Sequence, residues 1–170
     1  VNNTSVIKGN TLQITADTLT VASGGQVESA SDMALNLNTL LMPASNSVVL
    51  GGGTSFITLT EDLDNYGLIF SKNDLSVETS SFRNINNQSS GAISALNDLT
   101  VIGSNFTNSK TVYSGSDFTA NIANTFINDA SGQIDSGGSI DITAGNQFIN
   151  NNKIVTAVNI KISGPSFNNE

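Results

Sequence analysis

The chain has 170 residues, which is enough for one domain with a sizeable hydrophobic core. Only 12% of the residues are charged, the net charge is −8, and neither Cys nor His is present, which excludes disulfides and the usual zinc and copper ligands. With six Lys and Arg residues the chain cannot build a basic patch, so nucleic acid is excluded as a partner, and no apolar run approaches the roughly 20 residues that span a membrane.

Short segments in which apolar and polar residues alternate follow one another along the whole chain. Ile140-Asp141-Ile142 is typical, and turns such as Gly24-Gly25 and Gly137-Gly138 separate the segments. A period of two predicts short β-strands, whereas no segment has the apolar spacing of an amphipathic helix.

Three sets of positions repeat along these segments. The first set opens each unit with one apolar residue: Val6, Val27, Leu50, Ile69, Ile93, Val112, Ile134 and Ile154. Six residues later, the second set places a mostly apolar pair around one spacer: Leu12/Ile14, Met33/Leu35, Phe56/Thr58, Leu75/Val77, Leu99/Val101, Phe118/Ala120, Ile140/Ile142 and Ile160/Ile162. The third of these pairs is irregular, and Ile57/Leu59 is the alternative register there.

The third set closes each unit, most clearly as Phe-x-Asn. Leu19, Leu40 and Leu63 stand at this position in the early units. In the later units we expect an inward aromatic column: Phe82, Phe106, Phe126, Phe148 and Phe167. The asparagines two positions further on share this inward direction and are expected to form a buried amide ladder: Asn65, Asn84, Asn108, Asn128 and Asn150.

Repetition of one short-stranded unit predicts an all-β fold, a parallel β-helix (β-solenoid) of about eight rungs with 19–24 residues each. We expect residues 1–170 to form a single β-helix segment that belongs to a much longer secreted protein. Because the last rung of a solenoid leaves its strand edges open, the isolated segment is expected to stack end to end.

Three stretches resemble the haemagglutinin repeats of two-partner-secreted exoproteins of Gram-negative bacteria: Leu63 to Val77, Phe82 to Val101 and Phe126 to Ile142. That family includes filamentous haemagglutinin, contact-dependent growth inhibition effectors and related haemolysins. The resemblance is clearest over residues 60–170. It implies a right-handed parallel β-helix, a secreted or cell-surface location, and an outer-membrane transporter as the partner during secretion. It implies no catalytic residue, because these repeats carry none.

Acidic residues are the only material for metal binding or acid–base chemistry. Four of them precede the apolar pairs, where we interpret them as turn residues that accept backbone N–H groups, with calcium binding as the alternative: Asp32, Asp74, Asp98 and Asp117. Glu61, Asp62 and Asp64 form the densest acidic group, which we interpret as a solvated turn rather than a catalytic carboxylate pair. We therefore predict no catalytic residue, no cofactor and no metal site.

Most of the variation in unit length is predicted to lie in the arc between the Phe-x-Asn corner and the next unit. Its longest versions are 41–49 and 83–92. Such loops either pack over the neighbouring rung or contact a partner. The candidate contact residues are Leu41, Met42, Val48, Val49, Arg83, Asn86 and Asn87.

These observations favour a non-catalytic shaft or display segment of a secreted or surface-exposed bacterial exoprotein, acting in adhesion or contact-dependent toxin delivery. Two alternatives stay open. In the first, the arcs 41–49 and 83–92 bind a receptor or glycan on a host or target cell. In the second, the chain is a fragment of a β-helical polysaccharide-degrading enzyme.

Overall fold

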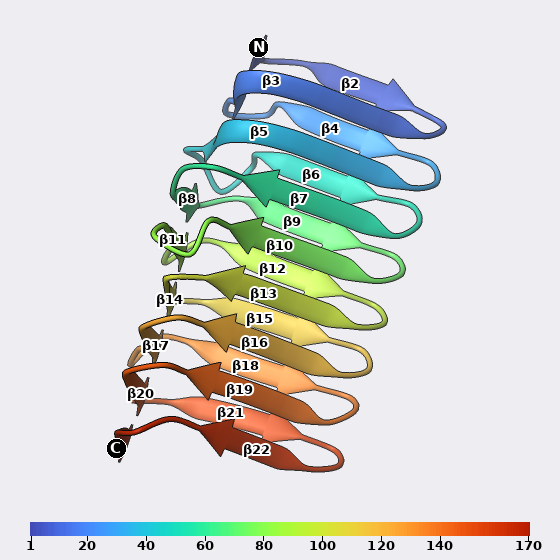
Figure 1. Ribbon diagram of the computed structural model, residues 1–170. Coiled ribbons are helices and arrows are strands. Elements are labelled where there is room, and N and C mark those ends of the chain that lie inside the picture. The colour runs from blue at the N-terminus through green and yellow to red at the C-terminus, as the bar shows by residue number, and fades with distance from the viewer.

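The computed structural model covers residues 1–170 and confirms the all-β prediction. The chain forms 23 strands and no helix, and it winds as a parallel β-solenoid of about eight rungs from the N-terminus to the C-terminus (Figure 1). All strand pairs are parallel, as in Leu75 beside Leu99, and each strand inside the rod pairs with the equivalent strands of the rungs before and after it. Because it has no helix, the chain has none that is long and apolar enough to cross a membrane.

Each rung contributes strands to three faces, which follow one another along the chain. The first face is an eight-stranded sheet: β2 (Val6–Gly9), β4 (Gln26–Ser29), β6 (Val48–Gly51), β9 (Leu68–Ser71), β12 (Ala92–Ala95), β15 (Thr111–Ser114), β18 (Gln133–Ser136) and β21 (Lys153–Thr156). The second face holds β7 (Ser55–Leu59), β10 (Leu75–Thr79), β13 (Leu99–Gly103), β16 (Phe118–Ile122), β19 (Ile140–Ala144) and β22 (Ile160–Ser163).

The third face holds the strands that close each rung: β1 (Asn2–Asn3), β8 (Leu63–Asn65), β11 (Asn84–Asn87), β14 (Asn105–Asn108), β17 (Thr125–Asn128), β20 (Gln147–Asn150) and β23 (Phe167–Asn169). In the first two rungs, the ten-residue strands β3 (Leu12–Val21) and β5 (Met33–Met42) run through both the second and the third face. The second and third faces are therefore joined into one 15-stranded sheet.

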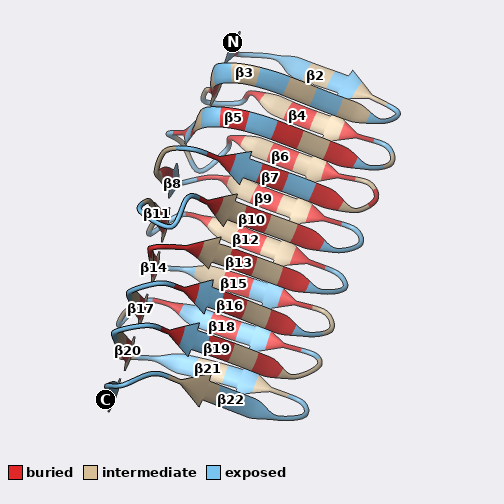
Figure 2. Cartoon of the chain, in the orientation of Figure 1, coloured by how far each residue is buried: buried red, intermediate tan, exposed pale blue.

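Alternation along each strand places one set of side chains inside the solenoid. Val77 and Ile142 are fully buried, whereas their neighbours in sequence point outward. The inward residues form one hydrophobic cluster of 31 buried side chains, which Figure 2 shows as buried segments along the length of the rod. Burial of these side chains at about 1.5–3 kcal/mol each is the main stabilising contribution.

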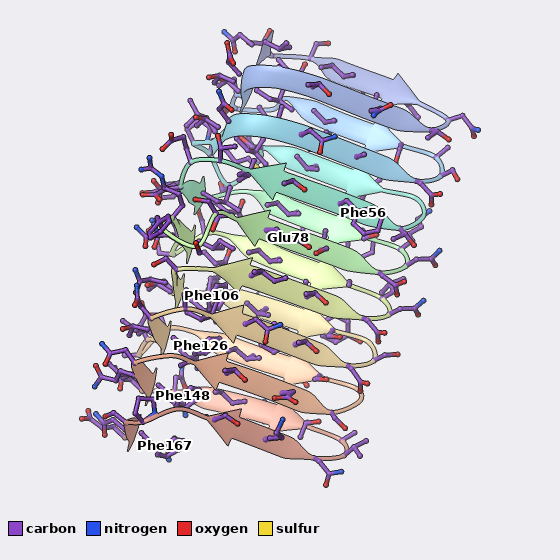
Figure 3. The ribbon with its side chains drawn as sticks, viewed as in Figure 1. Phe56, Glu78, Phe106, Phe126, Phe148 and Phe167 are labelled. Carbon is purple, nitrogen blue, oxygen red and sulfur yellow. The ribbon has the colours of Figure 1, made fainter.

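The predicted aromatic column is confirmed at its C-terminal end. The ring centroids of Phe106 and Phe126 lie 5.0 Å apart, those of Phe126 and Phe148 5.4 Å, and those of Phe148 and Phe167 5.1 Å (Figure 3). The last two pairs are stacked at 15° and 12°. Phe167 lies in the final rung, where no further rung covers it, and it remains 60% exposed.

Two predicted column members, Phe82 and Asn84, are wrong in the rung of β11. Ile85 pairs with Leu63 and Phe106 and occupies the inward position, while Phe82 is 87% exposed. The residues 80–83 form an extra turn between β10 and β11, closed by the N–H of Arg83 on the carbonyl of Ser80 at 3.0 Å. Part of the additional length of this unit therefore lies before β11, and the rest lies in the turn 88–91 between β11 and β12, inside the predicted arc 83–92. Phe82-Arg83-Asn84 at this turn matches the Phe-x-Asn motif, but Ile85 and Asn87 occupy the inward positions of the repeat.

Three other positions are displaced by one residue from the prediction. Val49 rather than Leu50 pairs with Val27 and Ile69, and Ile7 rather than Val6 pairs with Val27. In β7, Phe56 faces outward, and the inward residues are Ser55, Ile57 and Leu59. Since side chains alternate along a strand, a shift of one residue moves a side chain from the core to the surface.

Substituting Phe126→Asp would place a carboxylate inside the aromatic column, and we expect the free energy of unfolding to fall by about 4 kcal/mol or more. Phe82→Asp is the matched control, because Phe82 is 87% exposed and its replacement is expected to cost less than about 0.5 kcal/mol. Urea denaturation followed by far-UV circular dichroism measures both values. Equal stabilities for the two variants would refute the assignment of Phe126 to the core.

Candidate functional site

The asparagine ladder is the longest polar feature inside the solenoid. Six side chains form it, each donating from Nδ2 to Oδ1 of the next at 2.7–2.9 Å: Asn65, Asn87, Asn108, Asn128, Asn150 and Asn169. The five from Asn65 to Asn150 are completely or almost completely buried. The ladder prediction is thus confirmed for Asn65, Asn108, Asn128 and Asn150, whereas Asn87 takes the place assigned to Asn84.

The first five ladder amides also bond the backbone at the corner between the third and first faces. Asn87 Nδ2 donates to the carbonyl of Thr111 at 2.9 Å, and Asn65 Oδ1 accepts the N–H of Gly67 at 3.1 Å. The same column holds Val21 and Met42 in the early rungs, where the corner turns differ. The ladder therefore fixes the corner, and its neutral amides have their hydrogen-bonding capacity committed to structure.

The aspartates before the second face behave as the predicted turn residues. Each carboxylate accepts the backbone N–H of the equivalent residue one rung further on: Asp32 from Thr54 at 3.0 Å, Asp74 from Asp98 at 3.3 Å, Asp98 from Asp117 at 3.1 Å and Asp117 from Ser139 at 2.7 Å. No group of three or more His, Cys, Asp or Glu residues is arranged to hold a metal ion. This column links successive rungs along the outside of the rod.

The acidic group Glu61, Asp62 and Asp64 contacts the rung that follows it. Glu61 forms an ion pair with Arg83 at 2.8 Å, and Asp62 accepts the backbone N–H of Asn84 at 2.8 Å. Asp64 accepts the side-chain amides of Asn86 and Gln88 at 2.9 and 3.0 Å. The three carboxylates each bond a different part of the next rung and do not converge on one point. Glu61 and Asp62 hold the end of the extra turn at 80–83, and Asp64 bonds side chains further along the rung.

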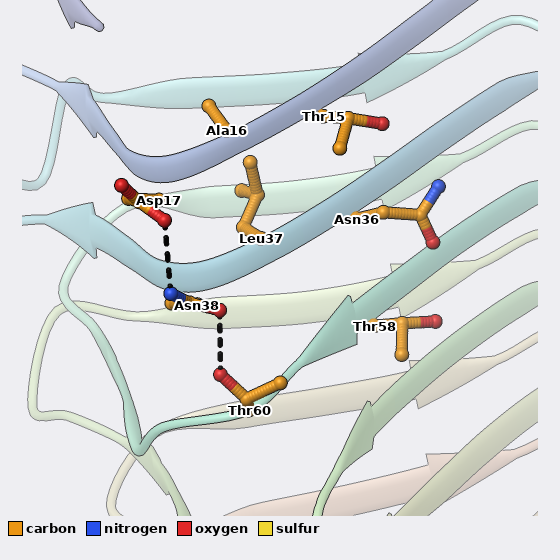
Figure 4. A pocket seen from close by; sticks show the side chains of 8 residues that line it. All are labelled: Thr15, Ala16, Asp17, Asn36, Leu37, Asn38, Thr58 and Thr60. Atoms are coloured by element: carbon orange, nitrogen blue, oxygen red, sulfur yellow. Dashed lines mark hydrogen bonds between the residues drawn. The ribbon is translucent and has the colours of Figure 1, made fainter.

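A shallow depression on the first three rungs is lined mostly by neutral side chains, chiefly Thr and Asn (Figure 4). Asn38 lies at its centre, donating to Asp17 at 3.1 Å and accepting from the hydroxyl of Thr60 at 2.8 Å. Asp17 is the one ionisable side chain in the lining. The depression can offer hydrogen bonds to a ligand, but it contains no acid–base pair.

The candidate contact residues divide into core and surface. Met42, Val49 and Asn87 are at most 1% exposed, so their prediction as contacts is wrong, because the alternation of β5, β6 and β11 directs them inward. The remaining four reach the surface. Leu41 and Val48 are outward residues of β5 and β6, while Arg83 and Asn86 bond Glu61 and Asp64.

The arc 41–49 and the strand β8 with the residue that follows it line one surface, which we call the corner site: Leu41, Pro43, Tyr66 and Asp64. Leu41 and Tyr66 are 42% and 38% exposed, and they form an apolar depression with Pro43 above the buried Met42. Asp64 stands beside Leu41 in the neighbouring strand, with Asn86 next in the same column. Tyr66 was missed by the sequence reasoning, although it directly follows the ladder residue Asn65 and so had to lie at the corner.

No protein-family model, curated protein or solved structure matches the chain. Functional inference therefore rests on the geometry of the rungs and on the repeat pattern of the sequence.

Replacing Asn108 by Ala would remove the acceptor for Asn87 and leave a gap in the middle of the ladder. We expect the free energy of unfolding to fall by about 2–4 kcal/mol, since buried polar groups lose partners and a cavity forms. Asn86→Ala removes an outward amide of the adjacent rung and is expected to change stability by less than about 0.5 kcal/mol. Chemical denaturation of the two variants checks this difference, and a loss as large at Asn86 would contradict it.

Proposed function

We propose that this chain is a non-catalytic shaft segment of a secreted or surface-exposed bacterial exoprotein, acting in adhesion or contact-dependent toxin delivery. The observation that carries the proposal is the sameness of the rungs. The core columns, the asparagine ladder and the aspartate column run from rung to rung, so the polar chemistry of the chain is used to hold successive rungs together. A rod of this kind separates or displays other parts of a protein.

The cellular context of this proposal comes from the resemblance to haemagglutinin repeats. It supplies the Gram-negative cell surface as the location and an outer-membrane transporter as the partner during secretion. The low charged fraction of 12% is compatible with a rod that is extended by repetition, since neutral side chains can be stacked in identical columns without repulsion.

Removal of one complete rung tests whether the rungs act as interchangeable spacers. Deleting residues 111–132 joins Lys110 to Gln133, which pairs with Thr111 and can take its place. Phe106 would then stack on Phe148, and Asn108 would bond Asn150. We expect a cooperatively folded rod that is shorter by about 4.8 Å, the spacing of parallel strands.

Deleting residues 111–121 is the matched control, because removal of about half a rung puts the faces out of register and is expected to abolish cooperative folding. Circular dichroism and small-angle X-ray scattering compare the two proteins. Loss of folding in the full-rung deletion would refute the spacer interpretation. Depolymerisation of an acidic polysaccharide by the intact chain, with or without calcium, would refute the claim that it is non-catalytic.

A second candidate function, binding of a receptor or glycan, is favoured by the corner site. Tyr66 and Leu41 present apolar surface, and Asp64, Asn86 and Gln88 present polar groups at the edge of it. Sugar rings stack on aromatic side chains while their hydroxyl groups bond carboxylates and amides, and few sites need more than one aromatic and several polar groups. Of the two predicted arcs, 41–49 lines this surface, and 83–92 reaches its edge through Asn86 and Gln88, which bond Asp64.

Tyr66→Ala would remove the aromatic wall of the corner site, and we expect binding to target cells or to arrayed glycans to weaken at least about tenfold. Phe82→Ala is the control, because it removes another exposed aromatic ring at a different corner. Titration of labelled protein onto cells and glycan arrays measures the effect. Equal binding by the two variants would refute a binding role for the corner site and leave the shaft role as the proposed function.

A further inference from the structure

The outward side chains of the first face form two columns across its eight strands. One column is Val6, Gln26, Val48, Leu68, Ala92, Thr111, Gln133 and Lys153, and the other is Lys8, Glu28, Leu50, Phe70, Ser94, Tyr113, Asp135 and Val155. Near the middle, β6 and β9 place four large apolar residues side by side, which we call the apolar patch: Val48, Leu50, Leu68 and Phe70. All four point away from the core, and each is partly exposed to solvent.

The charges on this face are balanced, in contrast to the rest of the molecule. Lys8 and Lys153 offset Glu28 and Asp135, so the outward columns of the first face carry no net charge. The whole chain carries −8, and that excess therefore lies elsewhere on its surface. Two copies can approach through the first face without the repulsion that their net charge would otherwise produce.

We propose that two copies of this chain associate side by side through their first faces, with the solenoid axes antiparallel and a two-fold axis along β9. Rotation about an axis parallel to the strands keeps each outward column opposite itself and reverses the order of the rungs. Phe70 and Leu68 then meet their own copies, β6 lies opposite β12, and β2 lies opposite β18. Such a contact is isologous and closed, so it ends at a dimer.

The order of charges along the outer column selects this arrangement. With β9 on the axis, Lys8 of each copy lies opposite Asp135 of the other, and Glu28 lies opposite the phenol of Tyr113. A shift of one rung in one direction brings Glu28 opposite Asp135, two like charges. A shift of one rung in the other direction moves Asp135 past β2 of the other copy, so that Asp135 no longer has a charged residue opposite it.

Parallel packing of the two rods is disfavoured by the same residues. A two-fold axis along the rods would place every rung opposite its own copy and exchange the two outward columns. Lys8 would then face Val6 and Glu28 would face Gln26, so neither charge would meet an opposite charge. Within one chain Lys8 also pairs with Glu28 at 3.0 Å, and the 65% exposed lysine side chain remains available on its outer side. Antiparallel packing thus combines an apolar centre with two ion pairs at its ends.

Sedimentation equilibrium of the 170-residue chain tests the association, and we expect the dimer to be the smallest associated species. Phe70→Glu places two carboxylates at the two-fold axis, and we expect it to raise the dissociation constant at least about 30-fold. Phe56→Glu is the matched control, because Phe56 is an outward phenylalanine of the second face and its replacement should leave the dimer unchanged. A chain that stays monomeric at about 1 mM, or a Phe70→Glu variant that associates as tightly as the natural chain, would overturn the proposal.

Cysteine crosslinking tests the register independently, because the natural chain contains no cysteine. Mixing Lys8→Cys protein with Asp135→Cys protein under mild oxidation should give a disulfide-linked pair. Neither protein alone should crosslink, since equivalent positions would then be about 29 Å apart across the two-fold axis. Efficient crosslinking of Lys8→Cys with itself would overturn the antiparallel arrangement. This association does not depend on the shaft or corner-site proposals, because those are tested separately by the rung deletion and by Tyr66→Ala.

Discussion

Parallel stacking in strict register is the constraint on which the rest of the structure depends. Each strand donates and accepts backbone hydrogen bonds with the equivalent strands above and below it, so a residue such as Val77 lies on Val101 and beneath Ile57. Because side chains alternate along a strand, the register that pairs the backbones also decides which residues are inside. One hydrophobic core can therefore run through all the rungs, although each rung alone would bury little.

The same constraint explains why the polar residues are mostly neutral. A column of identical charges would repel along the rod, whereas identical amides or hydroxyls can donate to one neighbour and accept from the other. The asparagine ladder uses this at the corner between the third and first faces. At the corner between the first and second faces, Ser71, Ser114 and Ser136 donate to backbone carbonyls of the adjoining turns. The aspartate column remains at the surface, where each carboxylate accepts a backbone N–H and is also solvated.

Function is therefore to be sought where the rungs differ, and the differences are concentrated in the N-terminal half. The corner site arises because Met42 replaces asparagine in the ladder column and Pro43 follows it. The apolar patch arises because β6 and β9 carry large apolar residues on both sides of the sheet. The first of these surfaces suits a ligand, and the second suits another copy of the chain. Neither feature interrupts the core columns.

The sequence by itself determined the fold class, the approximate number of rungs and most of the ladder, because a period of two within units of similar length allows one kind of packing. Phe106, Phe126, Phe148 and their asparagines were assigned from repetition alone. The sequence did not determine the inward residue where two neighbouring residues of a strand are both apolar, as at Val49-Leu50 and Phe56-Ile57. Nor did the sequence show that Ile85-Asn86-Asn87, and not Phe82-Arg83-Asn84, occupies the Phe-x-Asn position of this rung. Only pairing with Leu63 and Phe106 in the adjacent rungs decided that position, because inside and outside are defined by the neighbouring strands and not by the strand itself.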